Sequence, residues 1–175
     1  MEFEFRLARL SDIDEIMAII EDARKFLATQ NSGQWQDGYP SKELLIEDIE
    51  NMRLHLVLEG DEDSNIAGLC AIIEHEDAYD HLIEGKWLTN YPYLVIHRLA
   101  VKESCRGKGY GRALLEYFED IARMEGYRSI RVDTHENNLP MRGLIESEEF
   151  VYCGKALLHE NAERLAFEKV LSRLN

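Results

Sequence analysis

The chain has 175 residues, of which 45% are hydrophobic, and its 20 basic and 34 acidic residues give a formal net charge of −14. That length and apolar content suit one core, so we expect residues 1–175 to form a single domain. The negative balance excludes nucleic acid as a partner, because phosphate contacts need Lys and Arg; it favours a cationic or neutral small substrate, or serves solubility alone. No apolar run approaches the roughly 18 residues of a membrane-spanning helix, so no membrane is expected either.

The first part of the chain changes from a strand pattern to a helix pattern. Residues 2–9 alternate apolar and polar side chains, which is typical of a strand. Ser11 and Asp14 have the spacing of a capping box, so we expect a helix to begin there. A turn-rich loop at 31–40 follows, and Ser41 is expected to begin a second helix.

The same kinds of pattern continue to residue 171. Strands are expected at 55–59, 66–74, 95–101, 129–133 and 150–158, helices at 111–125 and 138–146, an acidic turn at 60–65, a turn near Asn161, and either a last strand or a tail at 165–171. Early hairpins followed by a β-α-β unit imply an α/β protein with a mixed α+β sheet, mostly antiparallel and flanked by helices.

The most informative stretch is Val95–Gly126, in which a buried strand, a glycine turn and an amphipathic helix follow one another. The first N–H groups of a helix have no partner within it, and the helix dipole leaves positive charge there. Glycine lets a phosphate approach the backbone closely and permits positive φ. The sequence therefore predicts a pyrophosphate site in this turn. The turn and helix start contain the glycines Gly107, Gly109 and Gly111 and the cations Arg106, Lys108 and Arg112.

Other phosphate-binding loops fit this turn less well. A P-loop needs G-x-x-x-x-G-K-[ST], and the sequence holds no such string. A dinucleotide fingerprint needs a third small residue where Arg112 or Leu114 stands, although Asp133 lies near the distance expected of a ribose-binding acid. A dinucleotide oxidoreductase stays open as an alternative, and so does a tight turn whose cations are simply solvated.

The stretch Arg106-Gly107-Lys108-Gly109-Tyr110-Gly111, after Leu99-Ala100-Val101, resembles the acetyl-CoA-binding signature of the GCN5-related N-acetyltransferases, the GNAT family. Downstream, Asn138-x-x-Met141-x-x-Leu144, followed by Phe150, resembles the second motif of that family. The resemblance implies the mixed sheet described above and acetyl-CoA as the cofactor. The matching positions, which the resemblance assigns to cofactor binding, are Leu99, Ala100, Val101, Arg106, Gly107, Lys108, Gly109, Tyr110, Gly111, Arg112 and Asn138.

The activity implied by the resemblance is N-acetyl transfer from acetyl-CoA to the primary amine of a small molecule, by direct attack. A non-catalytic acyl-CoA-binding module and acetylation of a protein or peptide amine are the alternatives. Dimers are common among relatives, so a homodimer is also expected. Cys70, Cys105 and Cys153 form no C-x-x-C pair, and the first residues lack the apolar core of a signal peptide; both observations favour free thiols and a cytoplasmic location.

The chemical groups needed for acetyl transfer are only partly visible in the sequence. The resemblance implies that backbone N–H groups near Leu99–Val101 stabilise the oxyanion. Many relatives carry a tyrosine, the usual general acid, seven residues after the asparagine of the second motif. In this chain Ile145 occupies that position and cannot donate a proton. Tyr152 or a water molecule is the remaining candidate for the general acid.

Two histidines are candidates for the general base, because histidine titrates near neutral pH. His97 lies on the central strand and would otherwise be a packed residue, and His135 follows a strand end and would otherwise stabilise a turn. Asn138, which the resemblance assigns to cofactor contact, would otherwise cap the following helix. The histidines show no ligand spacing, so no metal site is expected. Candidate substrate contacts, each with a structural alternative as core or solvated residue, are Trp35, Tyr39, Trp87, Asp133 and Glu136.

Overall fold

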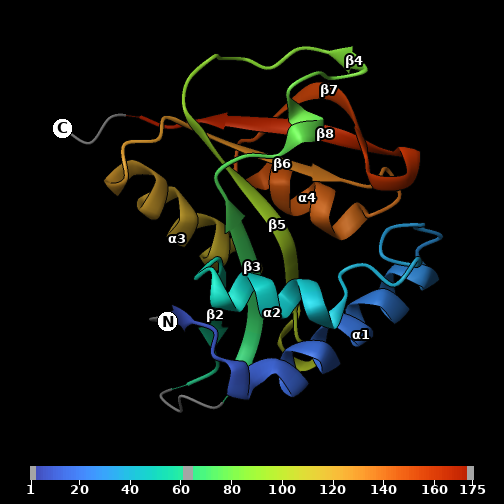
Figure 1. Ribbon diagram of the computed structural model, residues 1–175, viewed down its shortest axis with the longest axis vertical. Coiled ribbons are helices and arrows are strands. Elements are labelled where there is room, and N and C mark those ends of the chain that lie inside the picture. The colour runs from blue at the N-terminus through green and yellow to red at the C-terminus, as the bar shows by residue number, and fades with distance from the viewer. Residues whose placement is uncertain (1–2, 61–64, 173–175) are drawn as a thin grey trace. The chain divides into compact units, whose positions relative to one another are not determined.

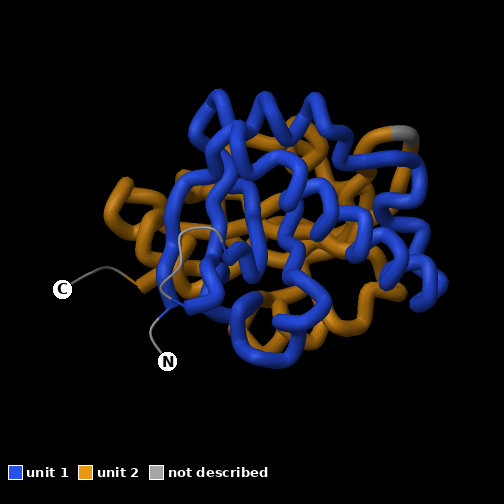
Figure 2. Tube along the Cα trace, turned by 90° about the horizontal axis from the view of Figure 1, so that it is seen from below, with its two compact units in different colours: residues 1–72, 98–115 blue, residues 73–97, 116–175 orange. Residues whose placement is uncertain are grey.

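The computed structural model describes residues 3–60 and 65–172, and the chain divides into two compact units. Unit 1 comprises residues 1–72 and 98–115, and unit 2 comprises residues 73–97 and 116–175 (Figure 2). Strand β5 (Tyr93–Val101) and helix α3 (Tyr110–Met124) each belong partly to one unit and partly to the other. The expectation of a single domain stays a prediction.

Unit 1 contains an antiparallel sheet and two helices that pack on it (Figure 1). Leu54, Leu56 and Leu58 alternate along β2, so they share one face of the sheet and are buried there with the apolar sides of both helices. The elements, in sheet order and then chain order, are β1 (Glu4–Leu7), β2 (Leu54–Leu58), β3 (Ile66–Ile73), α1 (Ile13–Thr29) and α2 (Lys42–Glu50).

The start of α1 differs from the sequence prediction. The proposed capping box of Ser11 and Asp14 is wrong, because Asp12 forms a capping box with Arg9 at a short 3₁₀ turn that precedes the helix. Its carboxylate accepts a hydrogen bond from the N–H of Arg9 at 2.7 Å and pairs with Arg6 at 2.8 Å. Since this ion pair is largely shielded from solvent, it favours a short 3₁₀ turn before α1 begins. The second helix, α2, has the predicted cap at Ser41.

Unit 2 contains a mixed sheet in which β5 and β6 are parallel and the other neighbours are antiparallel. The parallel pair is joined through α3, as the β-α-β pattern predicted. The last two strands form an antiparallel pair around a turn at Asn161, whereas the two-residue β4 was not predicted. The strand order after β5 is β6 (Ser129–Thr134), β8 (Ala162–Val170), β7 (Val151–Leu158) and β4 (Glu84–Gly85), and the helix is α4 (Leu139–Ser147).

Strand β5 changes its course in the middle. Its parallel pairing with β6 runs from Tyr93 opposite Ser129 to Ile96 opposite Val132, although both strands continue. Two residues later Arg98 has φ of +56°, which is rare in a strand for a residue with a Cβ atom. The residues after this point lie beyond the part of β5 that pairs with β6.

The second half of β5 lies very close to β3 within unit 1. A Cβ atom at Gly68 would be 2.9 Å from the carbonyl oxygen of Ala100, so only glycine fits there. The N–H of Lys102 donates to the carbonyl of Ala67 at 2.8 Å. On the same face, Leu114 of α3 lies near Gly68, which brings the first turns of α3 against β3.

The strand pairs of both units are mostly antiparallel and helices pack on them, which confirms the predicted fold class. The predicted acidic turn at 60–65 falls mainly on residues 61–64, outside the described residues. All three cysteines are free and buried, as expected. Within 3–60 and 65–172, no helix combines the length and apolar character needed to cross a membrane.

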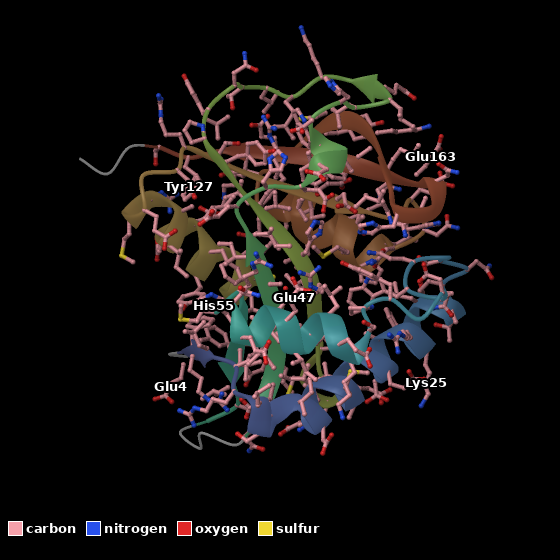
Figure 3. All side chains as sticks on the ribbon, viewed as in Figure 1. Glu4, Lys25, Glu47, His55, Tyr127 and Glu163 are labelled. Carbon is pink, nitrogen blue, oxygen red and sulfur yellow. The ribbon has the colours of Figure 1, made fainter. Side chains whose placement is uncertain are left out.

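Burial of His55 predicts an acid-sensitive step in stability. His55 lies on β2 (Figure 3), and desolvation lowers its pKa from 6.5 to about 4. Between pH 6.5 and about pH 4, His55 of the unfolded chain therefore takes up a proton while His55 of the folded chain does not. The free energy of unfolding consequently falls as the pH falls below 6.5. We expect a loss of about 2 kcal/mol from this residue between pH 7.5 and pH 5.

Urea unfolding of wild type and His55→Gln at the two pH values measures this contribution. The variant should lose less stability on acidification than wild type. His81→Gln, which changes an exposed histidine, is the matched control and should behave like wild type. Equal acid sensitivity of His55→Gln and wild type would contradict the assignment.

Candidate functional site

The turn between β5 and α3 has the backbone that the glycine pattern predicted. After a 3₁₀ turn at Glu103–Cys105, Gly107 and Gly109 have φ of +74° and +91°. A Cβ atom at Gly107 would meet nothing within 4 Å, and one at Gly109 would meet only Phe3 at 3.6 Å. Glycine is therefore needed here for its left-handed backbone, and the open space beside it leaves that backbone approachable.

The cations of the turn have different surroundings. The guanidinium of Arg106 lies 4.6 Å from the ring centre of Phe26, and its Nε donates to the carbonyl of Val101 at 3.3 Å. Lys108 is exposed and lies 3.5 Å from a carboxylate oxygen of Glu59, and Arg112 is exposed on the first turn of α3. Arg106 thus braces the turn against the end of β5, while Lys108 and Arg112 are exposed residues of the turn and the helix start.

Tyr110 fixes the first residue of α3. Its ring is buried and packs edge-on against Phe3, with ring centres 5.2 Å apart. The N–H of Ala113 donates to the carbonyl of Gly109 at 3.0 Å, which closes the first helical turn directly after the glycine. The positive end of the helix dipole consequently lies at the turn, where an anion would be stabilised.

A cluster of ionisable side chains surrounds His97 in unit 2. Nε2 of His97 lies 2.9 Å from Oε2 of Glu76, and Nδ1 lies 3.8 Å from Oδ2 of Asp133. Tyr79, which is fully buried, donates its hydroxyl hydrogen to the same Asp133 oxygen at 2.6 Å. Side chains from a loop, from β5 and from β6 thus meet; the four residues Glu76, Tyr79, His97 and Asp133 are called the His97 cluster below.

The two carboxyl groups of the His97 cluster differ in acidity. The hydrogen bond from His97 lowers the pKa of Glu76, against the effect of burial. Burial raises the pKa of Asp133, and the nearby His97 and the Tyr79 hydroxyl offset that rise only in part. Glu76 is therefore the group that stays ionised as pH falls, and Asp133 is the one that takes up a proton more easily.

The positions of the two imidazole nitrogens limit the protonation states of the cluster. A neutral imidazole carries one N–H and one lone pair. With the N–H of Nε2 given to Glu76, the lone pair of Nδ1 faces an Asp133 oxygen. That arrangement is favourable only if Asp133 carries a proton or if His97 is an imidazolium. In either state His97 is held between the carboxyl groups of Glu76 and Asp133.

Sequence reasoning missed Glu76 and Tyr79. Both come from the irregular segment between β3 and β5, which has no periodicity to interpret. Glu76 also caps the short 3₁₀ turn Asp77–Tyr79, accepting a hydrogen bond from the N–H of Ala78 at 3.2 Å. An acidic side chain one residue before a short turn gives only a capping signal, so its approach to His97 was not visible in the sequence.

Trp87 is held beside this cluster by a buried charge network. Its Nε1 donates to the carbonyl of Tyr79 at 2.7 Å, and the guanidinium of Arg131 lies 4.2 Å from its ring centre. Arg131 in turn pairs at 3.3 Å with Glu168, which is fully buried and also accepts hydrogen bonds from the Leu88 N–H and the Thr89 side chain. The loop that carries Trp87 is thereby fixed to β6 and β8.

The two candidate substrate contacts in unit 1, Trp35 and Tyr39, pack against other residues of that unit. Trp35 is buried in the apolar cluster beneath α1 and α2. The Tyr39 hydroxyl accepts a hydrogen bond from Nη1 of Arg98 at 2.7 Å, and its ring packs against the same apolar cluster. Their proposed role in an acceptor pocket stays a prediction.

The remaining candidates lie around α4 and β7. Nδ1 of His135 accepts a hydrogen bond from the N–H of Asn137 at 3.0 Å, which is the turn-stabilising alternative. Asn138 caps α4 through the N–H of Met141 at 3.3 Å. Glu136 is exposed on the same turn. Their proposed roles in catalysis, cofactor binding and substrate binding stay predictions.

Tyr152 and Ile145 differ sharply in exposure. Tyr152 is 50% exposed, and its ring packs edge-on against Phe167. Ile145 is fully buried on α4, so the position at which relatives carry a tyrosine is part of the core here. Tyr152 stays a candidate for the general acid.

One group of exposed residues has the geometry of a cation site. The ligand atoms of His75, Asp77 and Asp80 all lie within 4.8 Å of one another. His75 also forms ion pairs with both carboxylates, at 3.2 Å and 3.3 Å. These contacts account for the grouping without an ion.

Comparisons with known proteins agree with these features. The sequence profile of the family described as Acetyltransferase (GNAT) family matches residues 20–150. An acetyltransferase of the GNAT family from Streptococcus agalactiae is 36% identical, with a TM-score of 0.85 over 98% of this chain and 96% of that one. A GNAT-family acetyltransferase from Listeria monocytogenes, 20% identical, gives a TM-score of 0.73 over 98% and 96% of the two chains. A ribosomal-protein-alanine N-acetyltransferase from Brucella melitensis, 18% identical, gives 0.68 over 96% and 99%.

The chain belongs to the GNAT acetyltransferase family. It is an acetyl-CoA-dependent N-acetyltransferase, so the expected family and enzyme class are confirmed and the dinucleotide oxidoreductase is set aside. The Listeria and Brucella proteins are too distant to show more than the shared fold.

The hydrogen bond between His97 and Glu76 predicts the titration of Glu76. Replacing His97 with Phe removes the largest cause that lowers the pKa of Glu76, so that pKa should rise even though the hydrogen bond from the N–H of Ala78 remains. A carboxyl ¹³C NMR titration of wild type and His97→Phe measures the change. The exposed Glu74 is an internal control and should titrate alike in both proteins. An unchanged pKa at Glu76 would show that the contact does not exist in solution.

Proposed function

We propose that this enzyme transfers the acetyl group of acetyl-CoA to the primary amine of a small molecule by direct attack. The observation that carries the proposal is the His97 cluster, a proton acceptor on the strand that leads into the cofactor turn. An amine is mostly an ammonium ion near neutral pH and must lose a proton before it can attack. A histidine held between two carboxyl groups is suited to accept that proton.

The proposed reaction has three steps. The cluster accepts a proton from the ammonium, and the imidazolium of His97 is stabilised by Glu76 and Asp133. The free amine attacks the thioester carbonyl, forming a C–N bond, and backbone N–H groups near Leu99–Val101 stabilise the oxyanion. The C–S bond then breaks, the thiolate of CoA leaves, and the nitrogen gives its second proton to that thiolate or to water, which leaves a neutral amide. Because a thiolate is a weak base, with a pKa of about 8.5, it can leave without a dedicated acid, or take a proton from Tyr152 or water.

We place the diphosphate of acetyl-CoA at the turn between β5 and α3. Three features support this: the left-handed glycines, the start of a helix, and two solvent-facing cations, Lys108 and Arg112. Arg106 would act by holding the turn rather than by contacting phosphate. When bound, acetyl-CoA supplies the activated acyl group. Asn138 would contact the cofactor with whatever hydrogen-bonding capacity its capping role leaves.

Burial of the His97 cluster supports a slender acceptor. The exposed fractions of the His97 and Asp133 side chains are 9% and 7%. The reacting nitrogen must therefore approach groups that are nearly closed to solvent, which suits an amine on a narrow aliphatic stem. The Brucella protein is named for a protein substrate, so a peptide amine is the second acceptor class to test. The cytoplasmic location and the homodimer stay predictions.

The cofactor turn can be tested at Gly109. Gly109→Asp places a carboxylate and a Cβ atom at a left-handed position beside the proposed diphosphate. We expect CoA and acetyl-CoA binding to fall by at least about a hundredfold in calorimetry, because like charge is added and the backbone is strained. Gly126→Asp is the matched control: its φ is +83° and nothing lies within 4 Å of a Cβ atom there. If Gly109→Asp binds as tightly as Gly126→Asp, the site is wrong.

The role of the His97 cluster can be tested by turnover. Release of free CoA is followed with a panel of diamines, amino acids, aminoglycosides and a short peptide; release with any of them excludes a binding-only module. Glu76→Gln should lower kcat about a hundredfold, the usual contribution of acid–base catalysis, with little change in the KM for acetyl-CoA. Glu74→Gln makes the same chemical change at an exposed position and should keep wild-type kcat. Equal kcat values for the two variants would remove Glu76 from the mechanism.

A further inference from the structure

Arg98 combines two unfavourable features at one residue of β5. Its φ of +56° is a left-handed conformation that residues with a Cβ atom avoid. Its guanidinium is also buried, with 4% of the side chain exposed. Burial of a charged pair is weak evidence for a gain in stability, because the desolvation cost can exceed the attraction. Such a residue persists in a strand only where the surrounding structure holds it.

The partners of Arg98 hold its guanidinium from two directions within unit 1. Asp48 of α2, whose side chain is 1% exposed, contacts it twice: Oδ2 lies 2.7 Å from Nε, and Oδ1 accepts from Nη2 at 3.0 Å. Tyr39 accepts from Nη1 at 2.7 Å. A guanidinium with one carboxylate across two of its nitrogens and a hydroxyl on the third cannot rotate without breaking hydrogen bonds.

The Tyr39 side of this arrangement is itself anchored to α1. Arg24 donates from Nη2 to the carbonyls of Gly38 and Pro40, at 2.7 Å and 2.6 Å, and from Nε to the carbonyl of Tyr39 at 3.3 Å. The loop that carries Tyr39 is thus fixed by a second arginine. Both helices of unit 1 consequently determine where the side chain of Arg98 lies.

We propose that Asp48 and Tyr39 are positioning residues that keep Arg98 left-handed and thereby orient the backbone of Leu99–Val101. This inference rests on the proposed function, in which those backbone N–H groups meet the thioester and pantetheine arm of acetyl-CoA. Arg98 directly precedes this segment within unit 1, so its φ fixes the backbone conformation from which the segment begins. The side chain of Arg98 acts on the cofactor only through the backbone.

The test compares glycine with alanine at position 98 after the ion pair has been removed. Glycine adopts positive φ readily, whereas alanine favours extended backbone. We expect Asp48→Asn/Arg98→Ala to bind acetyl-CoA at least about fivefold more weakly than Asp48→Asn/Arg98→Gly in calorimetry. Equal acetyl-CoA affinities of the two double variants would overturn the inference.

A second ligand separates positioning from general destabilisation. Adenosine 3′-phosphate 5′-diphosphate carries the phosphates of CoA without the pantetheine arm, so it reports on the turn alone. Its affinity should stay within about twofold of wild type in both double variants. A parallel loss for both ligands would also overturn the inference, because it would indicate a general loss of structure.

Tyr39→Phe keeps the ring and removes only the hydroxyl, and it decides the question if the double variants do not fold. It should weaken acetyl-CoA binding about threefold and leave nucleotide binding unchanged; unchanged acetyl-CoA binding would count against the inference. Gly109→Asp identifies the source of a failure. If Gly109→Asp weakens the binding of both ligands while the two position 98 variants bind acetyl-CoA equally, only this inference fails. If Gly109→Asp weakens the binding of neither ligand, the proposed cofactor site fails as well.

Discussion

The structure depends on one left-handed residue in the middle of its central strand. Up to Ile96, β5 is held by its parallel pairing with β6. At Arg98 the backbone turns out of the strand conformation, and the following residues run close along β3. Hydrogen bonding between strands alone would favour a regular ladder, so this change of course needs side-chain contacts to maintain it.

Two consecutive side chains of β5 have charged partners of very different kinds. His97 contacts two carboxyl groups that differ in acidity. Arg98 contacts a carboxylate and a phenol. The strand therefore places a histidine that lies between two carboxyl groups next to a permanently charged guanidinium.

The acidic composition of the chain is used inside the protein as well as on its surface. The side chains of Asp48 and Glu168 are both buried and each meets an arginine, and Glu168 also accepts hydrogen bonds from the hydroxyls of Thr89 and Ser129. Buried charges of this kind fix a geometry because leaving either partner unpaired is costly. Ile145, at the position where the family resemblance implies a tyrosine, is buried and has no proton to donate.

The sequence by itself determined the strand–turn–helix unit, the cap at Ser41, most strands and helices, and through them the family. These features are local: glycine conformation, helix periodicity and strand alternation act over a few residues. Only the tertiary structure decided that Glu76 and Tyr79 meet His97, that Asp48 and Tyr39 meet Arg98, and that Asp12 rather than Ser11 organises the start of α1. The contacts around His97 and Arg98 join residues about 20 to 60 positions apart, several of them in loops without periodicity, and depend on how the chain packs.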